Sequence, residues 1–321
     1  MKLSRRTLLV GSAAASAFAF TRISAPAHAA APKAAGQVAG AYRISVGEIE
    51  VTALLDGFLE PGLEIMNNAD KDVAEKLLAE SFQDTVRLDV NAYLANAGGK
   101  LVLFDAGARD TLGPTLGTLP ASLKAAGVTP DQIDVLAVTH MHPDHIGGLI
   151  GKDGGAVFKN AVMHVSETDY KFWTSDEVLA NAEGNFRSFL ELARAVAAAY
   201  KERTQTFSGE GEVAPGITPV ALPGHTPGHV GYRVSSGKDQ LLIWGDIVHA
   251  PDLQFDQPDW TVRFDADPDM AAKSRMKILD EVAADRLQIA GMHLWYPGFG
   301  HVSRKGGKAY AFHPSRWQHK V

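Results

Sequence analysis

Hydrophobic and polar residues alternate along the chain just after residue 40. Ile44 and Val46 precede Gly47-Glu48, and Ile49 and Val51 follow it with the same spacing of two. An apolar residue at every second position is typical of a strand with one buried face. A glycine between two such runs suits a tight turn. The pattern therefore predicts a β-hairpin that turns at Gly47-Glu48.

Farther along, apolar residues recur every three or four positions, which is the spacing of one helix face. Helices are expected over residues 70–82 (with Val73, Ala74, Leu77, Leu78 and Phe82 on the apolar face), 121–126, 186–202 and 268–282. Another helix is expected to begin at Ser166, with Asp169 completing a capping pattern. Apolar runs predict strands near residues 217–221, 230–234, 240–245 and 287–291, the last being the final strand. Strands that alternate with helices in both halves favour an α/β (α+β) protein with two sheets, each covered by helices on its outer face.

The first 29 residues have the composition of an export signal. A charged start, a short Ala-rich apolar stretch and Ala27-His28-Ala29 predict a signal peptide over residues 1–29. The pair Arg5-Arg6 favours the twin-arginine route, with the general secretory route as the alternative. We therefore expect a periplasmic or secreted protein, with a flexible leader at 30–40 and a single domain at 41–321. The apolar stretch is short for a membrane span, so an uncleaved anchor is the lesser alternative.

Charge and cysteine content exclude several classes of function. The chain carries a net charge of −6 at pH 7. Residues 1–29 contain Lys2, Arg5, Arg6 and Arg22 and no acid, so the mature chain carries −6 − 4 = −10. Such a surface repels nucleic acid overall, and no Lys/Arg cluster offsets this. There is no cysteine, so disulfides, thiolate ligands and a cysteine nucleophile are all excluded.

The segment with the most chemistry is His-Met-His-Pro-Asp-His at residues 140–145, directly after the apolar run 135–138. Imidazole nitrogens and carboxylate oxygens are ligands of zinc and similar divalent ions. Further candidates follow at His225, Asp246 and His293, each where an apolar run ends. Side chains at strand ends are held by a rigid scaffold, as a preorganised metal site requires. The sequence thus predicts a metal site built from nitrogen and oxygen donors.

The order of these motifs resembles the metallo-β-lactamase superfamily of hydrolases over nearly the whole mature chain. The resemblance rests on Phe104-Asp105-Ala106-Gly107, Thr139–Gly148, Gly224-His225-Thr-Pro-Gly-His229, Gly245-Asp246 and His293. Within the superfamily the chain most resembles the methyl parathion hydrolase-like group of organophosphorus hydrolases and lactonases. That similarity is carried by Gly113-Pro-Thr-Leu-Gly117 and His293-Leu-Trp-Tyr-Pro-Gly-Phe-Gly-His301. The resemblance implies a four-layer αββα sandwich.

The resemblance also implies a centre of two divalent metals, zinc first, with manganese, cobalt or iron as alternatives. His140, His142 and His225 would hold one ion, and Asp144, His145 and His293 the other. Asp246 would bridge the two ions beside a hydroxide that attacks the substrate. Asp144 could also shuttle a proton.

Four other residues near these motifs are expected to support the site or to pack beside it. The resemblance implies that Asp105 supports the loop of metal ligands without binding the metal itself, and the alternative is that Asp105 only caps a turn. His229 is expected to support the site or to be structural, and His249 either lines the pocket or packs. His301 is a weaker candidate than His293 for the last ligand.

The resemblance implies that Trp173, Phe186 and Leu112 line the substrate pocket, with helix core as the alternative for both aromatic residues. Trp260 and Phe255 could close that pocket. Leu112 stands where relatives can carry an aromatic residue, which weakens any transfer of phosphotriesterase efficiency.

The substrate is expected to be a small uncharged ester, namely a lactone, an aryl ester or a phosphotriester, because no basic cluster lies near the motifs to hold an anion. Three alternatives remain open: thioester hydrolysis, sulfur oxidation at a single iron, and a non-catalytic periplasmic metal-binding protein. A homodimer is implied by resemblance alone. No nucleic-acid partner and no stable membrane insertion of the mature chain are expected.

Overall fold

The computed structural model describes residues 33–34, 36–209 and 211–319. The expected signal peptide, and residues 30–32 and 35 of the expected leader, lie outside the described residues. The chain divides into two units, Met1–Val38 and Ala39–Val321, and the helices and strands of the described residues belong to the second. Within the described part, every helix is too short or too polar to cross a membrane.

The first half of the unit builds one sheet. Within the described residues this sheet has seven strands in the order of the sequence: β1 (Ala41–Val46), β2 (Ile49–Leu59), β3 (Leu88–Ala97), β4 (Lys100–Phe104), β5 (Val135–Ala137), β6 (Val162–Ser166) and β7 (Thr204–Phe207). Strands β1 to β4 are antiparallel, and β4 to β7 run parallel. Val46 pairs with Ile49, which confirms the hairpin at Gly47-Glu48.

The second half builds the other sheet, of six strands among the described residues. Their order is β13 (Ala309–Pro314), β12 (Phe299–Gly306), β11 (Gln288–Ala290), β10 (Asp239–Ile243), β9 (Val230–Ser236) and β8 (Ile217–Ala221). The strands expected near 217–221, 230–234, 240–245 and 287–291 are all present. The expectation that the chain has no later strand was wrong, because β12 and β13 follow as an antiparallel hairpin. Much of β12 is polar and exposed, so it lacks the apolar alternation that marks a strand.

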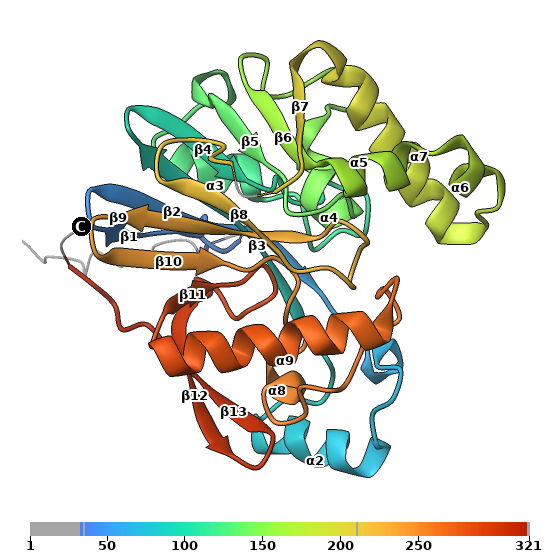
Figure 1. Cartoon of the computed structure of the whole chain (residues 1–321), viewed down its shortest axis with the longest axis vertical. Coiled ribbons are helices and arrows are strands. Elements are labelled where there is room, and N and C mark those ends of the chain that lie inside the picture. The colour runs from blue at the N-terminus through green and yellow to red at the C-terminus, as the bar shows by residue number, and fades with distance from the viewer. Residues whose placement is uncertain (1–32, 35, 210, 320–321) are drawn as a thin grey trace, which may run out of the picture. The chain divides into compact units, whose positions relative to one another are not determined.

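Helices cover the outer face of each sheet (Figure 1). The first sheet carries α3 (Leu119–Ala125), α4 (Pro143–Ile146), α5 (Glu167–Thr174), α6 (Asp176–Ala180) and α7 (Gly184–Ala199). The second carries α9 (Pro268–Asp285), with α8 (Pro251–Gln254) and α2 (Lys71–Glu80) nearby. Single 3₁₀ turns lie at Leu63–Ile65, Pro130–Gln132, Gly147–Leu149 and Lys201–Arg203. The arrangement is helix, sheet, sheet, helix, which confirms the expected αββα sandwich.

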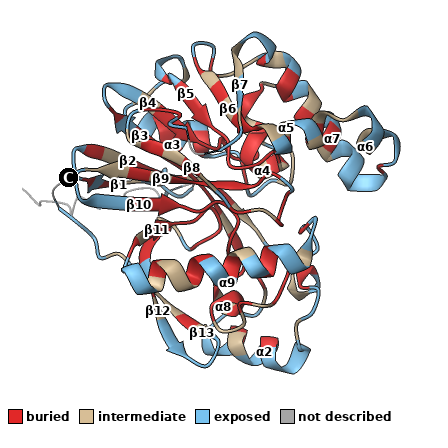
Figure 2. Ribbon diagram, in the orientation of Figure 1, coloured by how far each residue is buried: buried red, intermediate tan, exposed pale blue. Residues whose placement is uncertain are grey.

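Alternation along the strands explains why the sheets pack on both faces. On β4, Leu103 belongs to the apolar core beneath α3, α5 and α7, whereas Phe104 belongs to the core between the sheets. On β10, Ile243 faces the same inter-sheet core and Leu242 packs with residues of α9. Buried positions therefore run through both sheets, while the outer helices are exposed on one face (Figure 2). Each large apolar side chain removed from water contributes about 1.5–3 kcal/mol.

The end of α2 and the capping of α5 differ from expectation. Helix α2 ends at Glu80, and Phe82 lies beyond it with a φ of 59° and 96% exposure, so its expected place on the apolar face was wrong. Helix α5 begins after Ser166, but neither Ser166 nor Asp169 caps it in the expected way. Asp169 is instead buried and accepts hydrogen bonds from other segments.

Candidate metal centre

The segment from residue 140 to residue 145 leaves the end of β5 and turns into α4. His142 is the N-cap residue of α4, and Pro143 occupies its first turn, where a missing N–H costs nothing. The extended backbone before α4 brings two imidazoles together, so that His140 Nε2 lies 2.9 Å from His142 Nδ1. Asp144 and His145 follow within α4 itself. The turn thus separates the four side chains into two pairs.

The first pair meets two residues from the second half of the chain. His225, on the connection between β8 and β9, places Nε2 2.9 Å from His142 Nδ1. Asp246, just after β10, places Oδ2 3.3 Å from His225 Nε2 and 3.7 Å from His140 Nε2. These four donor atoms form one candidate metal-binding group.

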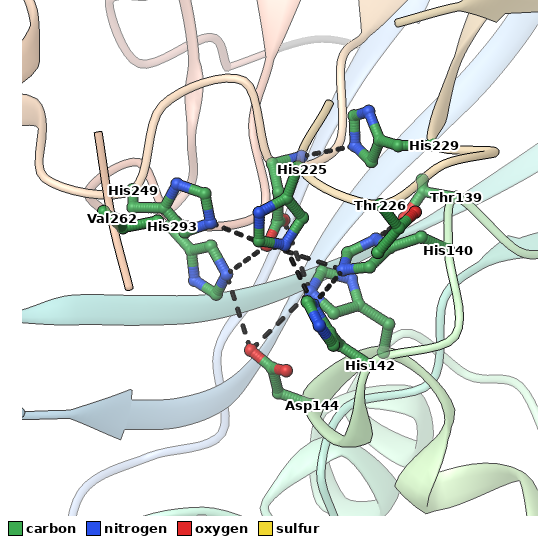
Figure 3. A network of polar contacts seen from close by, with 12 residues as sticks. Thr139, His140, His142, Asp144, His225, Thr226, His229, His249, Val262 and His293 are labelled. Carbon is green, nitrogen blue, oxygen red and sulfur yellow. Dashed lines mark hydrogen bonds and ion pairs between the residues drawn. The ribbon is translucent and has the colours of Figure 1, made fainter. Parts of the chain in front are cut away.

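The second pair meets His293, which follows β11. His145 Nε2 lies 3.6 Å from Asp144 Oδ2, and His293 Nε2 lies 3.4 Å from the same oxygen. Asp246 stands between the two groups, because its Oδ1 is 3.3 Å from His145 Nε2 and its Oδ2 is 3.1 Å from His293 Nε2. Figure 3 shows several of these side chains pointing toward one another. The structure therefore brings together all seven residues singled out in the sequence, and each group draws on both halves of the chain.

Hydrogen-bond acceptors on the outer side of two imidazole rings determine which ring nitrogen faces the candidate metal position. Asp105 Oδ2 lies 2.7 Å from His145 Nδ1, and Asp105 also accepts hydrogen bonds from the backbone N–H and the hydroxyl of Thr139. The carbonyl oxygen of Asp89 lies 2.8 Å from His293 Nδ1. Each contact holds the proton on Nδ1 and leaves Nε2 with a lone pair for a metal.

Asp265 gives His225 the same support but was missed in the sequence. Its Oδ1 lies 2.9 Å from His225 Nδ1, and its Oδ2 accepts a hydrogen bond from the backbone N–H of Val262. Asp265 sits in a loop between α8 and α9 that has no apolar periodicity, so the only local signal was the abundance of aspartates in that stretch.

Two further histidines have clear positions. His229 donates from Nδ1 to the carbonyl of Leu222 and accepts at Nε2 from the backbone N–H of Asp246, so it supports the loop that carries Asp246. Burial, followed by the charge of His225, lowers the pKa of His229 to about 3 and keeps the ring neutral. His301 lies on β12 and lines a separate polar pocket with Arg233.

Asp169 joins the two loops that carry the histidines. Its carboxylate accepts from the backbone N–H of Met141 at 2.9 Å, from the hydroxyl of Thr226 at 2.5 Å and from the backbone N–H of Gly228 at 3.1 Å. Met141 lies between two ligand candidates, and Thr226 follows a third. Asp169 is fully buried, so these bonds are not exposed to competition from water.

We expect the substitution Asp169→Asn to weaken metal binding by roughly 10–100-fold, because an amide places a donor against the N–H groups that the carboxylate accepts from. Metal titration against a competing chelator measures the effect. Asp176→Asn is the matched control, because the Asp176 side chain is 91% exposed. Equal affinity of the two variants would show that Asp169 does not position the site.

Electrostatics divide the cluster into neutral donors and charged partners. Burial lowers the pKa of His140 and His142 well below the usual histidine range. Burial alone would raise the pKa of Asp246, but the charges of His145 and His293 outweigh it and hold that pKa well below its usual value. Burial likewise opposes protonation of His145, yet Asp246 and Asp144 raise its pKa well above the usual range. A cation beside Asp246 would take the place of such a proton.

The donor set fits a divalent metal. Two atoms that each lie about 2.0–2.1 Å from a tetrahedral ion are roughly 3.3 Å apart. The separations in the first group, from 2.9 to 3.7 Å, bracket that value. Among the described residues, His145 Nε2 and Asp246 Oδ1 are buried and have no hydrogen-bond partner. Buried polar atoms are rarely left in this state, so a bound ion accounts for both.

A cavity of about 440 Å³ opens over the donors and includes Asp144, Asp246 and His293 in its wall. Leu112, one of the pocket candidates, lines it. A second cavity, of about 1040 Å³, adjoins the first through His142, Asn185, Phe189, His225 and Phe264, which line both. Trp173 and Phe186 line this second cavity.

Trp173 is also a core residue: it is 1% exposed, and its ring packs edge-on against His142. Trp260 and Phe255 are buried in apolar cores and line neither cavity, so their expected role in closing the pocket was wrong. Phe58, Phe189 and Phe264 were missed, because they come from three distant segments and share no local pattern.

The fold of this chain is similar to that of several solved hydrolases. The chain is similar to a hydrolase of the beta lactamase superfamily, AbOPH, with 33% identity and a TM-score of 0.84 over 88% of this chain and 100% of that one. It is similar to AidC, a dizinc quorum-quenching lactonase, with 26% identity and a TM-score of 0.82 over the same shares. A probable metal-dependent hydrolase from Staphylococcus aureus shares the fold, with 19% identity and a TM-score of 0.70 over 87% of this chain and 100% of that one.

No protein among the curated sequences matches this chain. Residues 85–317 match the metallo-beta-lactamase superfamily, which is more than half of the sequence and includes every metal-ligand candidate. With its αββα sandwich and its paired histidine and aspartate groups, the chain belongs to the metallo-beta-lactamase superfamily and is a metal-dependent hydrolase.

Proposed function

We propose that this protein is a dinuclear metal hydrolase that cleaves small uncharged esters: a lactone, an aryl ester or a phosphotriester. The observation that carries the proposal is the place of Asp246 between two ligand groups. One of its oxygens lies 3.3 Å from His145 Nε2, and the other lies 3.3 Å from His225 Nε2. A carboxylate with one histidine group on each side suits two ions that share a ligand.

The ions, zinc in the first instance, would supply Lewis acidity to water and to the substrate oxygen under attack. The residues of this chain do the rest. His140, His142 and His225 would hold one ion, and Asp144, His145 and His293 the other. Asp144 lines the cavity with 13% of its side chain exposed, so its carboxylate can receive a proton and pass it to a leaving-group oxygen.

The cavity walls favour an uncharged substrate. Phe58, Leu88, Leu112 and Phe189 supply apolar surface around the donors. Among the described residues that line the 440 Å³ cavity there is no lysine or arginine, and Glu60 adds a negative charge. Within this cavity an anionic ester would therefore lose its hydration without gaining a counter-charge from a side chain, since Arg263 lines only the adjoining 1040 Å³ cavity.

The known relatives support the same class of chemistry. AidC, a dizinc lactonase, has been solved with the product N-hexanoyl-L-homoserine, and it shares 26% identity with this chain. AbOPH, a hydrolase, shares 33% identity. A lactone is accordingly the first substrate to test.

The test is a substrate panel combined with metal analysis of the same preparation. Acyl lactones, p-nitrophenyl esters and paraoxon-type triesters are assayed with protein of measured metal content. We expect turnover of at least one class by protein that holds two divalent ions per chain. Two findings would remove the proposal: no turnover of any class by fully loaded protein, or a single iron per chain with sulfur-oxygenating activity.

Phe186 provides a test of the pocket. Its ring is 39% exposed and packs against Trp173 with 5.9 Å between ring centroids. We expect Phe186→Ala to raise KM several-fold for esters with a bulky apolar group, since about 1 kcal/mol of lost contact is a factor of roughly five. The kcat for a small ester should be unchanged. Phe82→Ala, at a 96% exposed position outside both cavities, is the control. Identical KM values for the two variants would place Phe186 outside the binding site.

We also propose that the protein is exported to the periplasm or beyond. The proposal rests on the sequence of residues 1–29, with Arg5-Arg6 before the apolar stretch. Replacing both arginines with lysine in the full chain is expected to leave most of the protein in the cytoplasm, as measured by cell fractionation. Unchanged export would instead indicate the general secretory route.

A further inference from the structure

His249 is not one of the seven ligand candidates, yet it lies among them. It follows Asp246 closely in sequence, is 2% exposed and lines the 440 Å³ cavity. Among the described residues, Nδ1 of its ring has no hydrogen-bond partner, and the polar group beside Nε2 is the carboxylate of Asp246. Leaving a buried polar group unpaired costs about 1–3 kcal/mol, and the carboxylate that Nε2 approaches is the one shared by the ligand candidates, so an ion at Asp246 would also lie beside this imidazole.

The position of His249 matches that of the other ligand candidates. Its Nε2 lies 3.1 Å from Asp246 Oδ2, the same distance as His293 Nε2 and shorter than the 3.3 Å of His225 Nε2. Its ring stacks on that of His293, with centroids 5.3 Å apart and an interplanar angle of 21° (Figure 3). Asp246, His249 and His293 form a third group whose donor atoms all lie within 4.8 Å of one another.

His249 also shares a feature with two of the ligand candidates. Within the part of the chain that the structure describes, the buried histidine and aspartate side-chain atoms that lack a partner belong to His145, Asp246 and His249. A bound ion explains the unpaired atoms of the first two. The same explanation extends to the third, because its Nε2 approaches the same carboxylate oxygen as His293.

We propose that His249 is an additional metal-binding side chain of this centre, which joins Asp246 and His293 in holding the second ion. The proposal rests on the proposed dinuclear function and deepens it. A neutral imidazole suits zinc, cobalt and iron alike. An extra nitrogen donor raises the number of protein ligands around the second ion, and zinc accepts a change from four to five ligands readily.

The experiment compares the full protein with His249→Leu and His249→Gln. Each is loaded with cobalt, and the affinity for the second ion is measured by competition with a chelator. We expect at least about a tenfold loss of second-ion affinity in both variants, since even residues behind the ligands change affinity by about 10–100-fold. Histidine-selective NMR of the cobalt protein is expected to show one fewer metal-shifted imidazole in both variants than in the unsubstituted protein.

The controls distinguish metal binding by His249 from a positioning role and from loss of the fold. His301→Gln, on β12 and outside both cavities, should change neither measurement. Thermal unfolding of the metal-free variants checks that each is folded, and the glutamine variant keeps a polar side chain of similar length. If the unsubstituted protein binds two ions and the variants lose neither affinity nor a shifted signal, His249 is not a ligand. If affinity falls but the same shifted signals remain, His249 only positions Asp246, and the proposal is equally overturned. Failure of the unsubstituted protein to bind two ions would instead remove the dinuclear function itself.

Discussion

Replacing Asp246 with alanine is expected to lower kcat/KM by more than about 10³-fold, because one change removes a donor from both ligand groups. Its Oδ1 faces His145, and its Oδ2 faces His225 and His293. The substitution also removes the negative charge that stabilises several of the buried imidazoles around Asp246. We therefore expect the variant to retain less than the full complement of metal, and not merely to turn over more slowly.

Metal content and activity should be measured on the same sample of the Asp246→Ala variant. Asp239→Ala is the matched control, because Asp239 lies at the start of β10, the strand that leads to Asp246, and is exposed. The control should keep full activity and two ions per chain. An Asp246→Ala protein with near-normal activity would show that the two groups do not share a carboxylate during turnover.

Removing the metals is expected to abolish activity and to lower the melting temperature by roughly 10 °C. Ions present at about 1,000 times their Kd stabilise the folded state by about 4 kcal/mol. A change of 1 kcal/mol moves the melting temperature of a chain of 150–250 residues by about 2–4 °C. We expect a local cause, because bound ions would neutralise Asp144 and Asp246 and satisfy buried donor atoms that otherwise lack partners.

Dialysis against a strong chelator, followed by calorimetry and assay, measures both effects. Adding back zinc, manganese, cobalt or iron one at a time then ranks the metals by recovered activity and melting temperature. Magnesium serves as a control, because it prefers oxygen donors over imidazole. Full activity after exhaustive chelation would exclude a metal-dependent reaction at this centre.

The sequence predicted the layers because the signal for them is local. The turn at Gly47-Glu48, the helix that follows Asp267-Pro268 and the apolar strands all depend on residues within a few positions of one another. The hairpin of β12 and β13 escaped because it is held by packing: Val302 and Tyr310 are its buried contacts with the core beneath α9. Strand β12 has buried residues only near its start, at Phe299, Gly300 and Val302, and β13 has Tyr310 alone, which is too little to mark a period of two.

The difference between local signals and long-range contacts also applies to the candidate metal centre. His140 to His145 form a compact motif, and Asp246 and His293 each follow a strand, so their chemistry is visible before any folding. By contrast, the carboxylate that contacts His225 Nδ1 belongs to Asp265, which is 40 residues away in sequence. Phe189 and Phe264 meet at the cavity from opposite halves of the chain. Such pairings depend on how loops cross the sheet edge, which no local pattern encodes.

The division of each ligand group between two halves of the chain has a consequence for maturation. Residues 41–207 build one sheet and supply His140, His142, Asp144 and His145, whereas residues 217–314 build the other and supply His225, Asp246 and His293, so neither segment holds the complete two-ion donor set. The complete two-ion centre would therefore form only after the two sheets have docked, so a precursor with undocked sheets is expected to be inactive. The occupancy of the centre in a freshly made preparation thus reports what fraction of its molecules has completed assembly.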